Sequence, residues 1–360
     1  MTATDTDIAA TRRRASGRDR LAARLGRLEP WLRILGLGWS VALLKVALGD
    51  SPRTHLAQLW RELVVPLLAI LGFLVAWGAL APQVHTSLGT IPGPVEVWQE
   101  AVKLHEDARI KAVRKERHRQ RVEERNRKLI AAGHPEKVRD IPYTGAPSFY
   151  DQIWTSIRTV FFGFALAALI AIPLGILAGL SATANAAMSP LVQIFKPVSP
   201  LAWLPLVTII ISAVHAGNEG LLSKSFLISG ITVTLCSLWP TLINTSLGVA
   251  SIDKDLINVS KVLKMDTMTK LRRLVLPSAL PLIFTGLRLT LGVGWMVLIA
   301  AEMLAQNPGL GKFVWDEFQN GSSRSLARIM VAVFTIGIVG FLLDRVMQAL
   351  QSLLTFTNDR

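Results

Sequence analysis

The chain has 360 residues, of which 51% are hydrophobic and only 18% are charged. Soluble domains usually carry about a quarter of charged residues, so this composition indicates a protein embedded in a bilayer. The formal net charge of +14 is concentrated in two segments outside the apolar stretches, which argues against a nucleic acid partner.

The N-terminal region is strongly basic. Residues 1–30 contain seven arginines and no lysine, so the positive-inside rule predicts a cytosolic arm that binds anionic headgroups. Residues 31–58 follow, and their apolar part, Trp31 to Gly49, contains Arg33 and Lys45. We expect an amphipathic helix in the membrane interface, with both cations reaching back to water. A transmembrane helix is the alternative, but it would export the arginine-rich arm.

Six apolar stretches are long enough to cross a hydrocarbon core about 30 Å thick. They lie near residues 64–81, 159–180, 199–215, 226–249, 282–301 and 329–351. The first predicts a transmembrane helix over residues 59–82. Small residues recur between Gly163 and Gly179, which allows helix backbones to approach closely. The sequence therefore predicts an all-α, polytopic membrane protein with six packed transmembrane helices.

The loop after the first span, residues 83–150, contains a charged insertion. Residues 103–140 hold thirteen Lys and Arg against seven Asp and Glu. Pairs such as Glu124 and Lys128, four residues apart, predict a solvated helical hairpin. Its place after the first span puts the insertion in the periplasm, since longer loops translocate despite their charge. It is interpreted as a spacer or as an extension that meets a periplasmic binding protein.

Polar side chains within the central spans are candidates for a translocation pathway. They are Thr208, Ser212, Thr241, Asn244 and Thr245. Residues four apart share a helix face, so the threonine and serine pairs could line a polar route. Alternatively, each hydroxyl bonds the carbonyl of the preceding turn or a neighbouring helix.

The loop at residues 250–280 is charged and lies between two spans. Ser251 or Asp253 can cap a first short helix, and Asp266 a second, by accepting hydrogen bonds from unpaired amides. Leu256, Ser260 and Leu263 are predicted to share one face. The remaining surface is basic, with lysines at positions 254, 261 and 264. This pattern predicts a helix-turn-helix that docks a partner; an amphipathic connector is the alternative.

Two charged residues occur in the next span. Arg288 lies six residues into it, which costs free energy unless the guanidinium pairs, faces water or reaches back to the cytosolic surface. Glu302 lies at the outer end of the same span. We include both among the candidate pathway residues.

The sequence contains no catalytic motif. Gly309-Leu-Gly-Lys312 resembles a phosphate-binding loop, but Phe313 replaces the Mg²⁺-binding Ser/Thr and Gln306 the first glycine. We therefore expect no ATP hydrolysis and no cofactor in this chain. The single cysteine, Cys236, cannot form an internal disulfide, and the six histidines lack metal-ligand spacing, so no metal site is predicted.

The loop at residues 250–280 resembles the cytoplasmic EAA signature of ATP-driven importer permeases. Asn258-Val-Ser260 occupies the Glu-Ala-Ala element, Lys264 the glycine position, and Leu274-Val-Leu276-Pro277 the closing I-x-L-P element. Further segments extend the resemblance over roughly residues 60–355. They are Ile91-Pro-Gly-Pro-Val-Glu-Val97, Pro173-Leu-Gly-Ile-Leu-Ala-Gly179, Phe195-Lys-Pro-Val-Ser-Pro-Leu-Ala-Trp-Leu-Pro205, Gly286-Leu-Arg288, Ala301-Glu-Met303 and Pro308-Gly-Leu-Gly311. These segments are similar to those of the nitrate, bicarbonate, taurine and sulfonate permeases, and most similar to the nitrate branch.

The resemblance implies the type I ABC importer fold, with a core permease domain at residues 151–355. It also implies a second copy of the chain as a homodimer partner, cytosolic ATPase subunits that bind ATP and Mg, and a periplasmic substrate-binding protein. Membrane lipids surround the chain, and both termini are expected in the cytosol of a bacterial cell, with the chain in the inner membrane. The residues expected to contact the ATPase are Asp253, Leu256, Asn258, Val259, Ser260, Leu263, Lys264, Leu276 and Pro277.

The resemblance implies a small oxyanion as substrate, with nitrate or nitrite first. Bicarbonate, cyanate, taurine or another sulfonate is the alternative within the same importer class. A secondary transporter would show paired inverted repeats and unwound spans, and neither pattern is present. A structural membrane anchor would not need the ordered loop at residues 250–280.

Overall fold

The structure, a computed structural model, describes residues 52–86, 89–215, 222–322 and 324–355, together with Ser40, Val41, Leu43 and Lys45. Helices dominate these residues, as predicted. The one strand pair in the described part is antiparallel, between β1 (His85–Thr86) and β2 (Gly89–Thr90). The predicted basic arm and nearly all of the predicted interfacial helix lie outside the described residues.

Five described helical segments are long and apolar enough to cross a bilayer, and one bent pair of helices can provide a sixth span. The five segments are Leu56–Gln83, Phe149–Leu180, Lys224–Ala250, Thr267–Ala305 and Ser325–Leu354. Each coincides with a predicted apolar stretch. The chain divides into two compact units, one holding residues 1–80 and 345–360 and the other residues 81–344.

In the first unit, three helical elements follow one another without a break. They are α3 (Pro52–Leu59), the π-helical turn η1 (Trp60–Val64) and α4 (Val65–Leu80). α4 has no charged side chain, as expected for a helix in hydrocarbon. A short 3-10 turn, η2 (Ala81–Gln83), begins the second unit.

The predicted third span needs correction. Residues 199–215 do not form a straight spanning helix, because α8 (Pro200–Val214) has only 15 residues. At 1.5 Å per residue it is about 22 Å long, short of a hydrocarbon core of about 30 Å. α7 (Ala182–Phe195) precedes it, and the two helices are bent by 101° at a break that contains Pro197. Proline has no backbone N–H to donate to the preceding turn, so the helix ends there.

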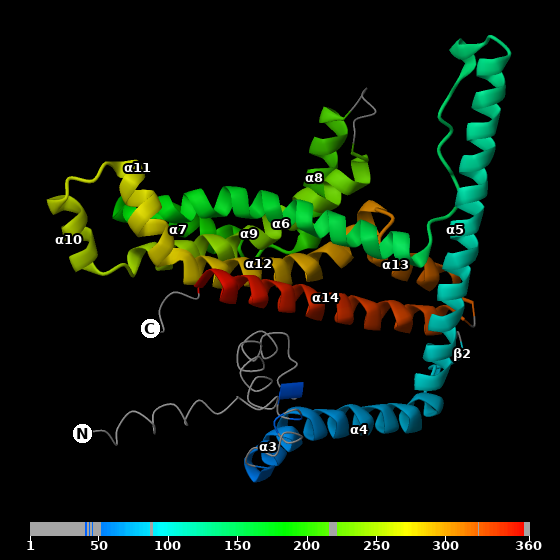
Figure 1. The fold of residues 1–360 in the computed structure, drawn as a ribbon, viewed down its shortest axis with the longest axis horizontal. Helices are drawn as coiled ribbons and strands as arrows, with labels where there is room; N and C mark the ends of the chain where they lie inside the picture. Colours follow the sequence, from blue (N-terminus) through cyan, green and yellow to red (C-terminus); the bar gives the residue numbers. More distant parts are fainter. Residues whose placement is uncertain are drawn as a thin grey trace, which may run out of the picture. The chain divides into compact units, whose positions relative to one another are not determined.

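The centre of the second unit consists of α6 (Phe149–Leu180), α9 (Lys224–Ala250) and α12 (Leu276–Ala305), which lie side by side with α14 (Ser325–Thr355) in Figure 1. Small residues permit this packing. A Cβ on Gly175 would come within 2.6 Å of the Thr245 Cβ, and so the α6 backbone can approach α9 only because glycine stands there. The predicted close approach around Gly163–Gly179 is confirmed.

The charged insertion forms one long helix, α5 (Pro94–Ala131), of 38 residues. It crosses the end of the bundle that lies away from α10 and α11 (Figure 1). The prediction of a helix is confirmed, but the returning arm is not helical. After the turn η3 (Pro135–Lys137) the chain runs back to α6 without regular structure, because Pro142 and Pro147 interrupt it.

A cluster of charged side chains fixes α5 to the bundle. Arg328 of α14 donates to Glu100 of α5 at 3.0 Å and to Glu317 of α13 (Leu310–Asn320) at 3.1 Å. Burial raises the pKa of Glu100, but the hydrogen bonds from Arg328 and Lys103 outweigh it and hold the pKa below its usual value. The Glu100 carboxylate is thus ionised at neutral pH, and the first part of α5 is held against the bundle.

Candidate functional site

The loop at residues 250–280 folds as two short helices, α10 (Lys254–Val262) and α11 (Thr267–Lys270). Asp253 caps α10 by accepting the amide of Asp255 at 2.9 Å. Asp266 caps α11 by accepting the amide of Thr269 at 3.2 Å, and its hydrogen bonds with Thr269 lower the pKa of the Asp266 carboxyl. Both predicted caps and the helix-turn-helix are confirmed. A π-helical turn, η4 (Leu271–Val275), leads from α11 into α12.

Lys264 forms the turn between the two helices. Its φ angle is 47°, in the left-handed region that glycine adopts more readily than other residues. The turn is closed by the amide of Met265, which donates to the Ser260 carbonyl at 3.0 Å. Lys264 occupies the position where the EAA pattern has glycine. The left-handed backbone that suits glycine is therefore present here, although the residue is a lysine.

One face of α10 packs on the membrane domain. Ser260 is only 2% exposed, and its hydroxyl donates to the carbonyl of Ile257 at 2.6 Å. The Ile257 side chain contacts a buried cluster that includes Val275 and Ala279, on either side of the Leu276-Pro277 step that starts α12. These contacts fix α10 against the end of the bundle.

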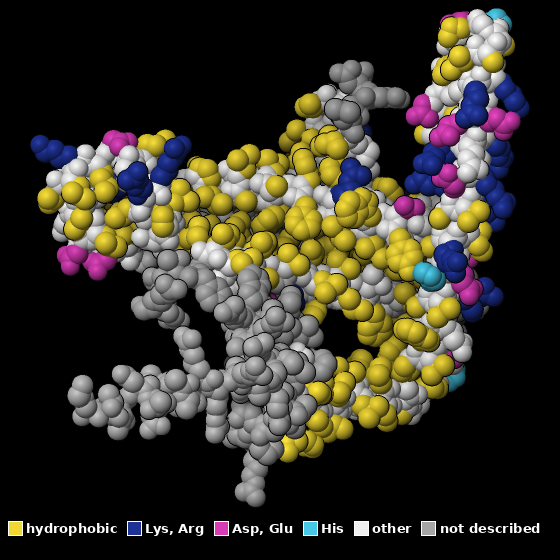
Figure 2. Space-filling view, in the orientation of Figure 1, with side chains coloured by type: hydrophobic (Ala, Val, Ile, Leu, Met, Phe, Trp, Pro, Cys, Tyr) yellow, Lys and Arg dark blue, Asp and Glu magenta, His cyan; other side chains and the backbone are white. Residues whose placement is uncertain are grey.

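The rest of the α10 surface carries exposed apolar side chains. Its large hydrophobic side chains are Leu256, Val259, Val262 and Leu263, of which Val262 is 82% and Leu263 60% exposed. Figure 2 shows hydrophobic side chains among charged ones at this end of the molecule. Helical spacing keeps Leu256, Ser260 and Leu263 on neighbouring positions as predicted, but their exposure differs, because Ser260 lies at the edge that meets the bundle. An exposed apolar patch with a charged surround is typical of an interaction surface.

The polar residues of α8 and α9 are mostly bonded within their own helices. Thr208 donates to the carbonyl of Leu204 at 2.8 Å, Ser212 donates to the carbonyl of Thr208, and the Asn244 amide donates to the carbonyl of Pro240 at 2.8 Å. Thr208, Ser212 and Asn244 are only partly buried, so the structure leaves part of their surface open.

Thr241 and Thr245 are placed differently. Both are 0% exposed and lie in the packing of α9 against α12 and α6. The Thr241 hydroxyl lies 2.7 Å from that of Thr290 on α12. Both threonines are thus enclosed between helices of one chain in this structure, and their place in the pathway stays a prediction. The physical reason for the enclosure is the close approach at Gly175 and Gly286, which covers them.

Arg288 is paired within the bundle. It donates to both carboxylate oxygens of Asp344 on α14, with the Nη2 to Oδ2 bond at 2.8 Å. A bidentate pair is the arrangement that best compensates an arginine inside a span. Sequence reasoning recognised the need for a partner but did not name Asp344, which lies in another apolar helix 56 residues along the chain.

Glu302 is the centre of a buried polar network. Its side chain is 0% exposed and lies 2.8 Å from the hydroxyl of Ser156 on α6. The amide of Gly311, in the first turn of α13, donates to it at 2.9 Å. Asn307 donates from the connection between α12 and α13, at 3.4 Å. Three elements thus converge on one carboxylate.

The backbone around Glu302 is shaped to admit it. A Cβ on Gly309 would overlap the carboxylate, so only glycine fits at that position. The amide of Leu310 donates to the Ser156 hydroxyl at 2.8 Å, so the free amides at the start of α13 are used by side chains of other helices. Lys312, part of the segment that resembles a phosphate loop, pairs with Asp316 at 2.8 Å.

Comparisons with known proteins identify relatives of the chain. Residues 171–355 match the family of the binding-protein-dependent transport system inner membrane component. The bicarbonate transport system permease protein CmpB of Synechococcus elongatus is 35% identical over 299 residues, which are 81% of this chain and 91% of that protein. The nitrate import permease protein NrtB of a Synechocystis species is 39% identical over 202 residues, 56% of this chain and 68% of that protein.

Among solved structures, an inward-facing MetNI methionine ABC transporter covers 57% of this chain and 96% of its own matched chain, with 18% identity and a TM-score of 0.49.

Proposed function

This chain belongs to the family of binding-protein-dependent inner membrane transport components, and we propose that it is the permease subunit of an ATP-driven importer of a small oxyanion, with nitrate as the first substrate. Members of the family are membrane permeases, and ATP hydrolysis belongs to separate subunits. The chain itself therefore has no catalytic residue in this proposal.

The observation that carries the proposal is the loop with α10 at its centre. Ile257 and Ser260 hold this helix on the bundle, while Val262 and Leu263 present an apolar surface to the surroundings. When a bound partner moves, α10 moves with it. The movement then reaches α12 through the Leu276-Pro277 dipeptide at the start of that helix. We assign the partner as the cytosolic ATPase, which binds ATP and Mg.

The remaining assembly follows from this assignment. A second copy of the chain completes the pore, and a periplasmic binding protein delivers the substrate. With α10 in the cytosol, both termini are also cytosolic, and α5 lies on the periplasmic side. The exposed arginines of α5 at positions 114, 117, 121 and 125 follow one helix face and suit an acidic protein surface.

Nitrate is favoured by residues that could donate to an anion without holding it. The Asn244 amide keeps a second N–H besides the one given to Pro240, and the Thr208 and Ser212 hydroxyls can exchange their bonds within the helix for one to an anion; all three residues are only partly buried. A strong fixed cation would bind an anion too tightly for release, and Arg288 is neutralised by Asp344. The identity of 39% with a nitrate import permease supports the same substrate.

Bicarbonate is the second candidate, because the bicarbonate permease of Synechococcus elongatus aligns with 81% of the chain, against 56% for the nitrate permease. Both anions are small, planar and singly charged, so the same donors serve either. Cyanate and sulfonates remain further alternatives within the importer class.

Uptake of labelled nitrate and labelled bicarbonate by a deletion strain, complemented with the intact chain, separates the two. We expect deletion to abolish growth on limiting nitrate and nitrate uptake, and complementation to restore both. Unchanged nitrate uptake in the deletion strain would exclude nitrate; loss of bicarbonate uptake in the same cells would assign the second substrate.

A further inference from the structure

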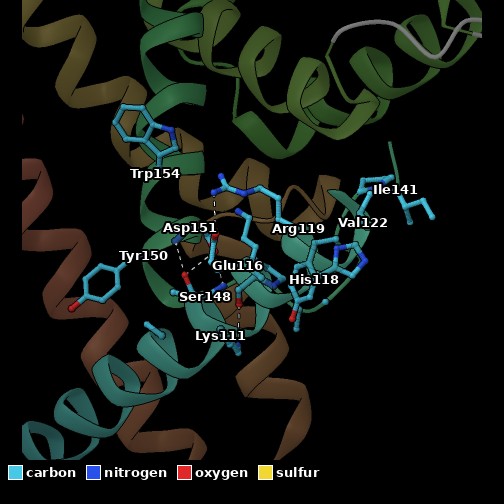
Figure 3. Close-up of a pocket in the computed structure, with 18 of the residues that line it drawn as sticks. Lys111, Glu116, His118, Arg119, Val122, Ile141, Ser148, Tyr150, Asp151 and Trp154 are labelled. Atoms are coloured by element: carbon cyan, nitrogen blue, oxygen red, sulfur yellow. Dashed lines mark hydrogen bonds and ion pairs between the residues drawn. The ribbon is translucent and has the colours of Figure 1, made fainter. Parts of the chain in front are cut away.

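A large cavity lies where the insertion meets the bundle, away from the α10 loop. It is open to solvent, has a volume of about 1200 Å³ and is lined by α5, the returning segment 138–147 and the first turns of α6. Figure 3 shows Lys111, Glu116 and Arg119 of α5 turned towards Ser148 and Asp151 at the start of α6. A cavity of this size exceeds what a nitrate or bicarbonate ion needs.

Several charged groups of the lining are already paired. Arg119 bonds Glu116 at 3.0 Å and lies 3.6 Å from Glu123. Asp151 accepts the Ser148 hydroxyl at 2.7 Å, and Lys111 donates to the carbonyl of Pro147 at 3.0 Å. These contacts hold the walls of the cavity together, and Arg119 is neutralised by its two glutamates.

Three cations of the lining remain available. Arg109, Lys115 and Arg158 make no hydrogen bond or ion pair within the described part of the chain, and Asp140 is the one lining carboxylate in the same state. The free charge of the cavity is therefore positive. Lys115 also acts on Asp151 through its charge, whereas the two arginines have no such partner among the residues that the structure describes; such a group of cations suits an anionic ligand.

Arg158 is the most informative of the three, because it lies in a membrane span. It is exposed on the third turn of α6, where an unpaired arginine costs free energy unless an anion or water meets it. Tyr150 and Trp154 precede it at intervals of four residues on the same face, and Trp154 is 60% exposed. Tyrosine and tryptophan in this position mark the level of lipid headgroups.

The same face of α6 continues into hydrocarbon. Phe161 and Leu169 follow Arg158 at helical spacing and are 41% and 71% exposed. The α6 surface thus presents aromatic rings, then a cation, then apolar side chains in the order in which a phospholipid presents its headgroup and acyl chains.

We propose that this cavity binds the headgroup of an anionic glycerophospholipid. Arg158 and Lys115 contact the phosphodiester, Tyr150 and Trp154 lie beside the polar head substituent beyond the phosphate, and the acyl chains lie along Phe161 and Leu169. The ligand chemistry is that of a phosphate ester. A lipid is favoured over a free oxyanion because the apolar surface continues directly from the cations.

Native mass spectrometry of the full-length chain in mild detergent tests the proposal. The chain is titrated with phosphatidylglycerol and with phosphatidylcholine of the same acyl chains. The test variant is Lys115→Gln with Arg158→Gln. The matched control, Arg114→Gln with Arg127→Gln, removes two cations of α5 that do not line the cavity.

We expect the native chain and the control to retain one phosphatidylglycerol per chain, about tenfold in preference to phosphatidylcholine, and the test variant to lose this preference. Equal retention of phosphatidylglycerol by the test variant, or equal retention of both lipids by the native chain, would overturn the proposal. If the test variant does not fold, the single variant Lys115→Gln, on an exposed helix, is measured instead. The same loss of preference for phosphatidylglycerol is expected, and an unchanged preference would overturn the proposal.

A competition arm distinguishes the lipid from free anions. Inorganic phosphate, nitrate and bicarbonate are each added in large molar excess to the chain with bound phosphatidylglycerol. Retention of the lipid supports the proposal. Displacement by any of the three would assign the cavity to a soluble oxyanion and contradict the assignment to a lipid.

Discussion

Ser156 of α6 and Glu302 of α12 meet in the interior of the bundle, with the serine hydroxyl 2.8 Å from the carboxylate. Both side chains are 0% exposed, and both also receive backbone amides from the first turn of α13. The two residues thus fix the position of α13 relative to two spans through groups that have no access to water.

Removing this carboxylate should destabilise the chain. In Glu302→Ala, the donors at Ser156, Asn307 and Gly311 lose their acceptor, and a buried unpaired polar group costs about 1–3 kcal/mol. We expect a lower midpoint of thermal unfolding in detergent, with a smaller decrease for Glu302→Gln. Glu106→Ala, on the exposed surface of α5, is the control and should leave the midpoint unchanged. Equal midpoints for Glu302→Ala and the control would contradict the structural role.

The pair of Arg288 and Asp344 predicts a rescue by charge exchange. Arg288→Asp and Asp344→Arg alone each place two like charges together in a span, so both should lower the yield of folded protein and its unfolding midpoint. The double exchange restores opposite charges and should recover part of the loss. A double variant no more stable than the worse single variant would show that the pair does not join α12 to α14.

The left-handed backbone of Lys264 predicts a stabilising substitution. Glycine adopts a φ of 47° without the steric cost of about 1–2 kcal/mol that a side chain incurs, although it also loses more entropy on folding. Lys264→Gly should therefore raise the free energy of unfolding by roughly 0.5–1 kcal/mol. Lys261→Gly, inside α10, should lower it by about 1 kcal/mol. A destabilising Lys264→Gly would refute the assigned turn.

Orientation can be tested at α5. After Cys236→Ala, a single cysteine introduced as Gln120→Cys lies on an exposed part of the helix. We expect it to react with a membrane-impermeant maleimide in cells whose inner membrane is intact. Labelling that requires lysis would place α5 in the cytosol and reverse the proposed topology.

Local features of the site could be predicted from the sequence because they depend on near neighbours. Asp253 and Asp266 act on amides two and three residues away, and the spacing of the loop elements is independent of the rest of the chain. The spans were recognisable for the same reason, since hydropathy is a property of a contiguous segment.

Long-range partners could not be predicted. Asp344 lies 56 residues from Arg288, and Ser156 lies 146 residues from Glu302, so each pairing is set by how the spans pack. Helical periodicity also did not show that Ser260 is buried while Leu256 is exposed, because a helix of nine residues with apolar side chains on several faces does not specify which face meets the bundle. The bend before α8 was also missed, although Pro197 stands in the break between the two helices.

The central claim, that the exposed face of α10 binds the ATPase, is tested most directly by co-purification of the complex from cells that express the chain with its ATPase subunits. Leu263→Asp places a charge in a contact that excludes water, which costs on the order of 2–5 kcal/mol in interfaces. We predict that this variant is inserted in the membrane in normal amount but neither retains the ATPase nor supports ATP-dependent uptake, whereas Val113→Asp on α5 leaves ATPase retention unchanged. A Leu263→Asp variant that binds the ATPase at the native yield and transports normally would contradict the account.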